Sequence, residues 1–182
     1  MTFSELSGYL DRLEATSSRN DLVKTLAELY MKSSPDEIQP LTYLIQGRLV
    51  PFFEPVEIGL GEKLVMAAIA QAFAIPIVEV TKLFGQLGDL GLVAAKLSAH
   101  GSTLPLPVTE VHARLMDIAG AAGGGSVEKK RSLFAALLKQ VDPASAKHLV
   151  RMALGRLRLG IGDPTVLDAL SFAKKGDRSA RP

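Results

Sequence analysis

The sequence of 182 residues contains no cysteine and no tryptophan, and aromatic residues make up only 5% of it. Without cysteine there can be no disulfide framework, no thiolate metal site and no thiol redox chemistry, which favours a reducing, intracellular location. The aromatic side chains fall mostly within apolar helical patterns, as Phe73, Phe84 and Phe134 do. Because a single-strand stacking platform needs exposed rings, this distribution argues against one.

Long hydrophobic runs are also missing, since no window holds the roughly eighteen uninterrupted apolar residues that a membrane span needs. The N-terminal segment, MTFSELSGYLDRLEA, is amphipathic and lacks the basic region and apolar stretch of a signal peptide. With 47% hydrophobic and 22% charged residues, the composition is globular and excludes wholesale disorder. We therefore expect a soluble protein with no membrane partner, folded as one compact domain.

The motifs of common enzyme classes are absent from the sequence. His100, His112 and His148 are far apart and lack the H-E-x-x-H spacing of a zinc site. There is no Walker lysine motif and no G-x-S-x-G nucleophile motif. We therefore assign no catalytic residue and no metal ligand.

What the sequence does contain is a strong separation of charge along the chain. Residues 1–111 carry 8 basic and 13 acidic side chains, a net charge of −5, whereas residues 112–182 carry 13 basic and 6 acidic, a net charge of +7. The small overall charge of +2 conceals this asymmetry. A basic half indicates a polyanionic partner, although a solvated basic face without any partner would show the same charges.

Apolar residues recur at helical spacing along almost the whole chain, which predicts an all-α, compact domain of about ten to twelve helices. Start signals support several helices, because Ser34, Asp142 and Asp163 each precede a proline that suits the first helical turn. The polar tail KKGDRSARP is predicted to be a frayed end or the start of a linker. The expected helices cover residues 3–14, 18–32, 35–46, 62–73, 76–87, 89–99, 108–121, 126–140, 143–154 and 163–173.

An internal repeat relates two parts of the chain, about residues 18–74 and 126–173. The motif G-R-L occurs at 47–49 and at 155–157, and a G-[LI]-G-acid motif follows it at 59–62 and at 160–163. The first copy has seven additional residues between these motifs, around VPFFEPV. Two such copies predict helical subdomains related by a pseudo-twofold axis, whereas chance matching of leucine and alanine is the alternative.

The glycine-rich segment GAAGGGSVEKKR is a candidate phosphate-binding turn. Gly124 and Gly125 let a ligand approach the backbone closely, and Ser126 can cap the helix that follows. Lys129 and Lys130 lie in the first two turns, where cations oppose the helix dipole and help only if an external anion is present. A triple glycine is otherwise more often a simple connector.

The segment GRLRLGIGD is a second candidate site. Gly160 and Gly162 can turn the chain tightly into the following helix, while Arg156 and Arg158 alternate along an extended stretch and so point the same way. Two guanidinium groups on one face suit phosphates, although a structural turn with two solvated arginines remains possible. The segment is no dinucleotide-binding fingerprint, because its third glycine and its βαβ unit are missing.

Five segments resemble, in family order, the N-terminal DNA-binding domain of archaeal and eukaryotic-type ATP-dependent DNA ligases. They are F-S-E-L at 3–6, V-P-x-F-E-P with IGLGEK at 50–63, G-D-L-G-L-V-A at 88–94, S-x-x-K-K at 126–130 and LGRLRLGIGD at 154–163. The resemblance covers about residues 3–173. It implies a monomeric, all-helical domain that grips nicked duplex DNA over the minor groove, mostly through backbone phosphates, without reading the sequence.

The resemblance also implies site residues and partners. It adds Ser18 and Arg19 to the two segments chosen above, so the expected DNA contacts are Ser18, Arg19, Gly124, Gly125, Ser126, Lys129, Lys130, Arg156, Arg158, Gly160 and Gly162. Residues 1–173 would form the DNA-binding domain, and residues 174–182 would begin a linker to an adenylation domain and an OB-fold domain that are absent here. The full-length enzyme would use ATP and magnesium, with none held by this fragment, in DNA replication, repair and recombination. We expect it inside the cell, in the cytoplasm near the nucleoid if the source is prokaryotic.

An alternative from another class is a helical protein-interaction module whose basic face meets an acidic partner. If DNA is the partner, the two copies are expected to contribute unequally, because the first carries Glu54, Glu57 and Glu62 near its turn.

We predict that this chain forms no covalent adduct with AMP. The ligation chemistry of the family uses the lysine of a K-x-D-G motif, and the nearest segment here, Lys175-Gly176-Asp177, has the wrong order. Incubation with radiolabelled ATP and magnesium, followed by denaturing electrophoresis, should show no labelled band. A stable adduct on a lysine would show that the chain has nucleophilic chemistry of its own.

Overall fold

The computed structural model describes residues 1–98, 104–157 and 159–180. Over these residues the protein consists of ten α-helices and one isolated β-bridge between Thr2 and Pro107, with no strand or sheet. The all-α prediction is confirmed, and each expected helix is present with its ends shifted by at most two residues. The helices are α1 Phe3–Glu14, α2 Arg19–Lys32, α3 Pro35–Leu44, α4 Glu62–Phe73, α5 Ile77–Leu87, α6 Leu90–Ser98, α7 Val108–Gly120, α8 Ser126–Leu138, α9 Pro143–Ala153 and α10 Asp163–Lys175.

The helix starts follow the expected signals at two positions and differ at two others. Asp142 caps α9 by accepting a hydrogen bond from the Ser145 backbone at 3.1 Å, and Ser34 precedes α3 as expected. Asp163 is the first residue of α10 rather than its cap, because Gly162 takes the extended cap conformation. The expectation that Ser126 caps α8 is wrong as well: the cap position belongs to Gly125, whose φ of 77° requires a glycine.

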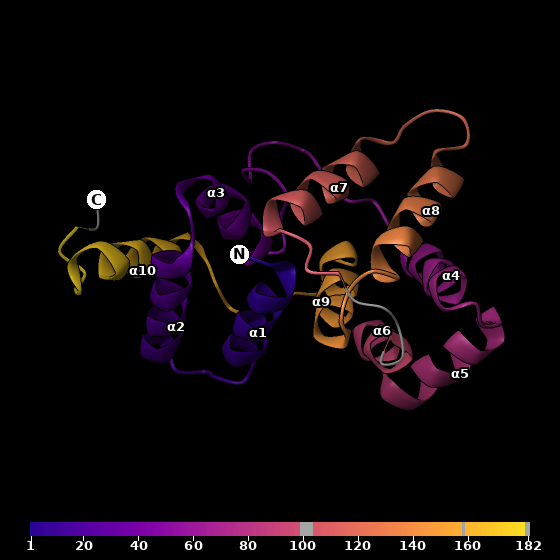
Figure 1. Ribbon diagram of the computed structural model, residues 1–182, viewed down its shortest axis with the longest axis horizontal. Coiled ribbons are helices and arrows are strands. Elements are labelled where there is room, and N and C mark those ends of the chain that lie inside the picture. Colours follow the sequence, from indigo (N-terminus) through magenta and orange to yellow (C-terminus); the bar gives the residue numbers. More distant parts are fainter. Residues whose placement is uncertain (99–103, 158, 181–182) are drawn as a thin grey trace.

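The molecule is elongated, with different helix groups at its two ends (Figure 1). Helices α2 and α10 pack on each other at one end, α4, α5, α6 and α8 lie at the other, and α1 and α9 lie between them. One continuous cluster of buried apolar side chains runs through the helices, with Phe3, Leu26, Ile69, Leu90 and Phe134 among its fully buried members. Burial of such side chains provides most of the driving force for this fold.

The two sequence repeats exchange their helices. The main partner of α2, in the first copy, is α10 of the second copy, and the main partner of α8, in the second copy, is α4 of the first. The matching turns have the same backbone conformation, since φ is 70° and 63° at Gly47 and Gly155, and 69° and 68° at Gly59 and Gly160. A pseudo-twofold axis relating the copies stays a prediction, but each copy clearly buries its helices against the other.

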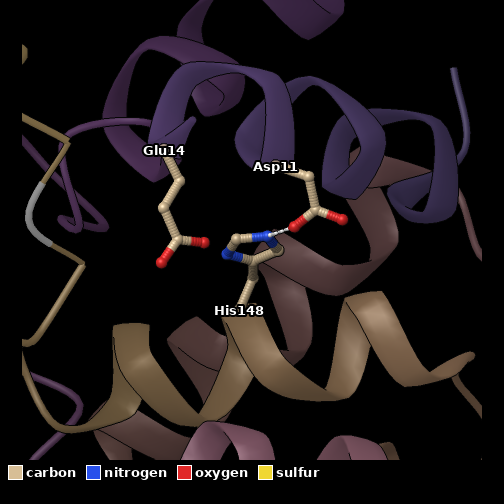
Figure 2. A group of neighbouring side chains, drawn as sticks. All are labelled: Asp11, Glu14 and His148. Carbon is tan, nitrogen blue, oxygen red and sulfur yellow. Dashed lines mark hydrogen bonds and ion pairs between the residues drawn. The ribbon is translucent and has the colours of Figure 1, made fainter. Parts of the chain in front are cut away.

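A network of charged side chains, centred on the buried His148, joins α1 to α9 (Figure 2). His148 is fully buried, and its Nε2 donates to Asp11 at 2.6 Å. Lys147 binds the same Asp11 carboxylate at 2.7 Å and Glu14 at 3.0 Å, and Arg151 binds Glu14 at 2.6 Å. Burial alone would raise the pKa of Asp11, but the hydrogen bonds from Lys147 and His148 outweigh it and hold that pKa below its ordinary value.

Residues 176–180 after α10 are tied to the fold rather than frayed, and the alternative that they begin a linker stays a prediction. Ser171 donates its hydroxyl to the Asp177 carbonyl at 2.8 Å and accepts a hydrogen bond from the Ala180 backbone at 3.0 Å. Gly176, with φ of 76°, allows the sharp exit from α10 that makes these bonds possible. The polar composition of this segment predicted a free end, because the sequence does not show that the Ser171 hydroxyl bonds to its backbone.

In the part of the chain that the structure describes, no individual helix has the length and apolarity of a membrane span. Helices α4 and α5 meet those criteria only when taken together, and they meet at a bend of 116°.

We predict that the free energy of unfolding decreases as the pH falls below about 6.5. Burial lowers the pKa of His148 below its ordinary value of 6.5, although its hydrogen bond to Asp11 opposes the shift. Below that pH, His148 binds a proton in the unfolded chain more readily than in the folded chain. The free energy of unfolding therefore decreases on acidification, by at most about 1.4 kcal/mol per pH unit. Urea unfolding between pH 7.5 and pH 5 measures this slope, in a range above the titration of the carboxylates.

The matched variant is His148→Gln, whose amide can still donate to Asp11 but does not titrate. Its unfolding free energy should depend less on pH over the same range, whatever its absolute value. An unchanged slope would assign the pH dependence to other groups.

Candidate nucleic-acid interface

The glycine turn before α8 is open to solvent. Gly123 and Gly125 have φ of 82° and 77°, so this turn needs glycine for its backbone conformation. Gly124 is exposed, and a Cβ atom placed on any of these three glycines would meet nothing within 4 Å. Lys129 is exposed one turn into the helix, and its backbone N–H donates to the Gly125 carbonyl at 3.0 Å. The geometry leaves room for a ligand to approach the backbone beside a cation.

Lys130 reaches across to the glycine turn of the other copy. Its Nζ donates to the Ile58 carbonyl at 3.2 Å and would lie 2.9 Å from a Cβ atom on Gly59. The next residue, Arg131, forms an ion pair with Glu128 and donates to Gln71 in α4 at 3.1 Å. Helix α8 therefore adds positive charge to the turn that begins α4, a juxtaposition that the sequence spacing did not reveal.

The arginines of the two G-R-L motifs form reciprocal ion pairs between the copies. Arg156 Nη2 lies 2.8 Å from the Glu62 carboxylate, and Arg48 Nη2 lies 3.3 Å from the Asp163 carboxylate, which also accepts from Gln46 at 2.8 Å. Each arginine thus meets the acid of the other copy's G-x-G-acid motif. Glu62, expected to repel DNA, is the partner of Arg156, so the acidic residue holds one of the predicted contacts in place. Both pairs are partly exposed, which limits their contribution to stability to about 1 kcal/mol or less.

Gly160 and Gly162 of the second candidate segment are exposed at the surface. Gly160, with φ of 68°, has open space around it, and Gly162 provides the extended residue before α10. Between them and Arg156, the buried Leu159 anchors the segment. Arg158 lies outside the described residues, so its common direction with Arg156 stays a prediction.

The two residues added by resemblance begin α2. Ser18 is the cap of that helix and accepts from the Asp21 backbone at 3.4 Å. Arg19 is 59% exposed, and its guanidinium lies 3.3 Å from the carboxylate of Asp168, which is buried in α10. The structure therefore places this pair where α2 packs on α10, away from the turn that Lys130 contacts.

A cleft between the glycine turns has one exposed aromatic ring in its lining, and a second exposed ring contacts that one. The cleft is lined by both copies, among others by Gly47, Phe52, Gly59 and Gly155. Phe52 and Phe53 are 76% and 72% exposed, and their rings meet edge to face at 5.5 Å. The expectation that the aromatic residues are mostly inside helices therefore missed these two. The signal for their exposure was their position in a proline-flanked insertion without helical periodicity.

The residues of Figure 2 also have the spacing of a metal site. Asp11, Glu14 and His148 each place one possible ligand atom within 4.8 Å of the others. However, Lys147 and Arg151 already neutralise the two carboxylates at 2.6–3.0 Å, so a cation would have to compete with both. The arrangement favours an ion-pair network that joins α1 and α9 over a metal centre.

Comparison with known proteins gives one consistent result. A family model described as DNA ligase N terminus matches residues 2–171. A probable DNA ligase from Dictyoglomus turgidum is 42% identical over 182 residues, which are 100% of this chain and 31% of that relative. A DNA ligase from Sulfolobus acidocaldarius is 44% identical over 195 residues, with 100% of this chain and 33% of the relative covered. A probable DNA ligase from Aquifex aeolicus is 40% identical over 179 residues, at 97% and 31% coverage. The chain thus spans about a third of the length of the relatives it matches.

We predict that the two copies contribute unequally to binding of a polyanion. Lys129→Ala together with Lys130→Ala should reduce the slope of log affinity for duplex DNA against log salt by about two, because each phosphate contact contributes about one unit. Arg48→Ala should have a smaller effect, because Glu54 and Glu57 line the same cleft as Arg48 and repel phosphates. Fluorescence anisotropy with a labelled duplex measures both.

Circular dichroism on every variant excludes unfolding as the cause of weaker binding. If folded Arg48→Ala loses more affinity than the double variant, the assignment of the DNA face to α8 is wrong.

Proposed function

Because the chain belongs to the family of DNA ligase N-terminal domains, we propose that it binds duplex DNA over the minor groove through the phosphate backbone and without sequence preference. In this role it holds nicked DNA in place for ligation. Binding to phosphates sets the position of a protein on DNA but carries no sequence information, which suits an enzyme that must act wherever a nick occurs.

The observation that carries the proposal is the distribution of positive charge at α8. Arg131 is paired with Glu128, but Lys129 and Lys130 also lie within the first two turns, where the positive end of the helix dipole disfavours cations. Such an arrangement costs stability unless an anion neutralises it. The exposed glycine turn just before the helix supplies backbone N–H groups at the same place, which is the arrangement that anion sites use.

The wider activity follows from the family. We propose that the domain acts with an adenylation domain and an OB-fold domain of its parent chain, and that ATP and magnesium serve the parent enzyme. The roles are DNA replication, repair and recombination, which place the protein with DNA inside the cell. The domain acts as a monomer, since a single chain already contains both repeats.

A protein-interaction module is the second candidate, and the exposed rings of Phe52 and Phe53 favour it. Solvent-exposed aromatic pairs are typical anchors of protein interfaces. The charge distribution indicates that such a module would bind an acidic partner protein through its basic face. A preference for acidic protein over duplex DNA at equal salt would favour this alternative.

We predict that duplex binding weakens steeply with salt and does not depend on sequence. About four to eight neutralised phosphates would give a slope of log affinity against log salt of roughly −0.9 per contact. The titration is made with nicked, intact and single-stranded DNA, each in several unrelated defined sequences. Binding that is insensitive to salt would contradict the phosphate-backbone proposal, whereas a strong preference for one sequence would contradict the lack of base reading.

A further inference from the structure

A buried carboxylate in α10 brings together three separate segments of the chain. Asp168 is 1% exposed, and its Oδ2 lies 3.3 Å from Nη2 of Arg19 and 3.8 Å from Nε of Arg178. Arg19 is the first residue of α2, whereas Arg178 follows the end of α10. Two guanidinium groups from distant positions in the sequence therefore meet at one oxygen atom.

The cluster carries more positive charge than Asp168 can neutralise. A carboxylate this buried needs a charged partner, because it has lost its hydration, and one guanidinium meets that need. The second guanidinium leaves a surplus positive charge. The side chains of Arg19 and Arg178 remain 59% and 47% exposed, so the surplus faces solvent. Lys174 and Lys175, in the last turn of α10, are exposed close to Arg178 in the chain.

Acidic neighbours reduce this surplus without removing it. Asp21 and Asp177 are exposed near Arg19 and Arg178 in the chain. Asp177 is also engaged, since its Oδ1 accepts a hydrogen bond from the Ser179 backbone at 2.8 Å. Even with both counted beside Asp168, basic side chains outnumber acidic ones in these segments.

Arg178 is held in place by its own segment as well as by Asp168. Its Nη2 donates to the Asn20 side chain at 2.9 Å, which fixes the guanidinium to the first turn of α2. On its N-terminal and C-terminal sides, the Asp177 carbonyl and the Ala180 backbone N–H both bind the Ser171 hydroxyl. The arginine is thereby oriented before any ligand arrives, which lowers the entropy that a ligand must overcome.

We infer that Arg19 and Arg178 form a two-arginine clamp for a backbone phosphate of duplex DNA, and that Asp168 is the positioning residue that orients both. The inference rests on the proposed function and extends it to Arg178 and to residues 176–180. Guanidinium groups suit a phosphate because their planar donors match two of its oxygens. Since both meet the same oxygen of Asp168, both can also reach one phosphate group beside it.

The clamp has a consequence for the segment after α10. A phosphate bound to Arg178 ties residues 176–180 more firmly to α2, because Arg178 is the side chain that joins them. Occupancy of the DNA site and the position of this segment are therefore coupled, and the coupling passes through one arginine. Amide hydrogen exchange of residues 176–180 should slow when a duplex is added.

The test compares three variants of the 182-residue chain for binding to a random-sequence duplex across a salt series. Arg178→Ala should weaken binding about five- to tenfold near 0.1 M salt and reduce the salt slope by about one. Arg12→Ala is the matched control, because Arg12 is 51% exposed and paired with an acid, but with the exposed Glu28. It removes the same charge from a site without a buried carboxylate and should change affinity less than twofold.

The third variant, Asp168→Asn, separates positioning from simple charge. Removing a negative charge would strengthen DNA binding if only net charge mattered. If Asp168 orients the two arginines, the same change weakens binding several-fold although the net charge has become more positive. If Asp168→Asn does not fold, Arg178→Lys replaces it in the test. Lysine retains the positive charge but lacks the planar, two-pronged set of N–H donors of a guanidinium group. Arg178→Lys should therefore recover less than half of the affinity that is lost in Arg178→Ala.

The outcomes separate this inference from the proposed function. If Arg178→Ala binds like Arg12→Ala while the double change at Lys129 and Lys130 weakens binding, the clamp is overturned and DNA binding stands. Tighter binding by Asp168→Asn would overturn the positioning role. If the unmodified chain shows no salt-dependent binding of duplex DNA, the proposed function fails and the clamp fails with it.

Discussion

Exchange of helices between the two repeats is the constraint on which the rest of this structure depends. An amphipathic helix must bury its apolar face, and α2 and α8 bury theirs mainly against α10 and α4 of the opposite copy. Neither copy could therefore keep its packing without the other. The exchange also carries each G-R-L turn to the start of the other copy's helix, so the candidate interface is composite throughout.

The charged residues follow this exchange closely. Arg48 and Arg156 each pair with an acid of the other copy, and Lys130 extends from α8 to the turn before α4. These pairs are too exposed to stabilise the fold by much. Their effect is to hold long cationic side chains near glycine turns in defined positions, where they would otherwise sample many rotamers. Carboxylates in the interface thus orient positive charge rather than oppose it.

Burial separates two kinds of charge cluster in this domain. In the network of Asp11, Glu14, Lys147, His148 and Arg151, the lysine and the arginine are only 16% and 15% exposed and each is paired with carboxylates, so the network acts on the stability and pH dependence of the packing between α1 and α9. The cluster around Asp168 has surplus positive charge that faces solvent. The paired, largely buried cations of the first cluster suit a structural contact between helices, and the exposed surplus charge of the second suits the binding of an anion. The difference lies in the charge balance and exposure of the cations, not in the types of residue.

The helices could be predicted from the sequence because they depend on local chemistry. Apolar spacing, proline at helix starts and glycine at positive φ act over a few residues, and they located all ten helices in the described chain. Family motifs likewise identified the DNA ligase N-terminal family, which the comparison confirmed. Only the tertiary structure could decide which acid each arginine meets, since Glu62 and Arg156 are 94 residues apart and Arg19 and Asp168 are 149 apart. It also decided that Gly125 rather than Ser126 caps α8, and that the tail is held by Ser171. Such partners depend on how helices pack, and packing is set by the whole core rather than by any one segment.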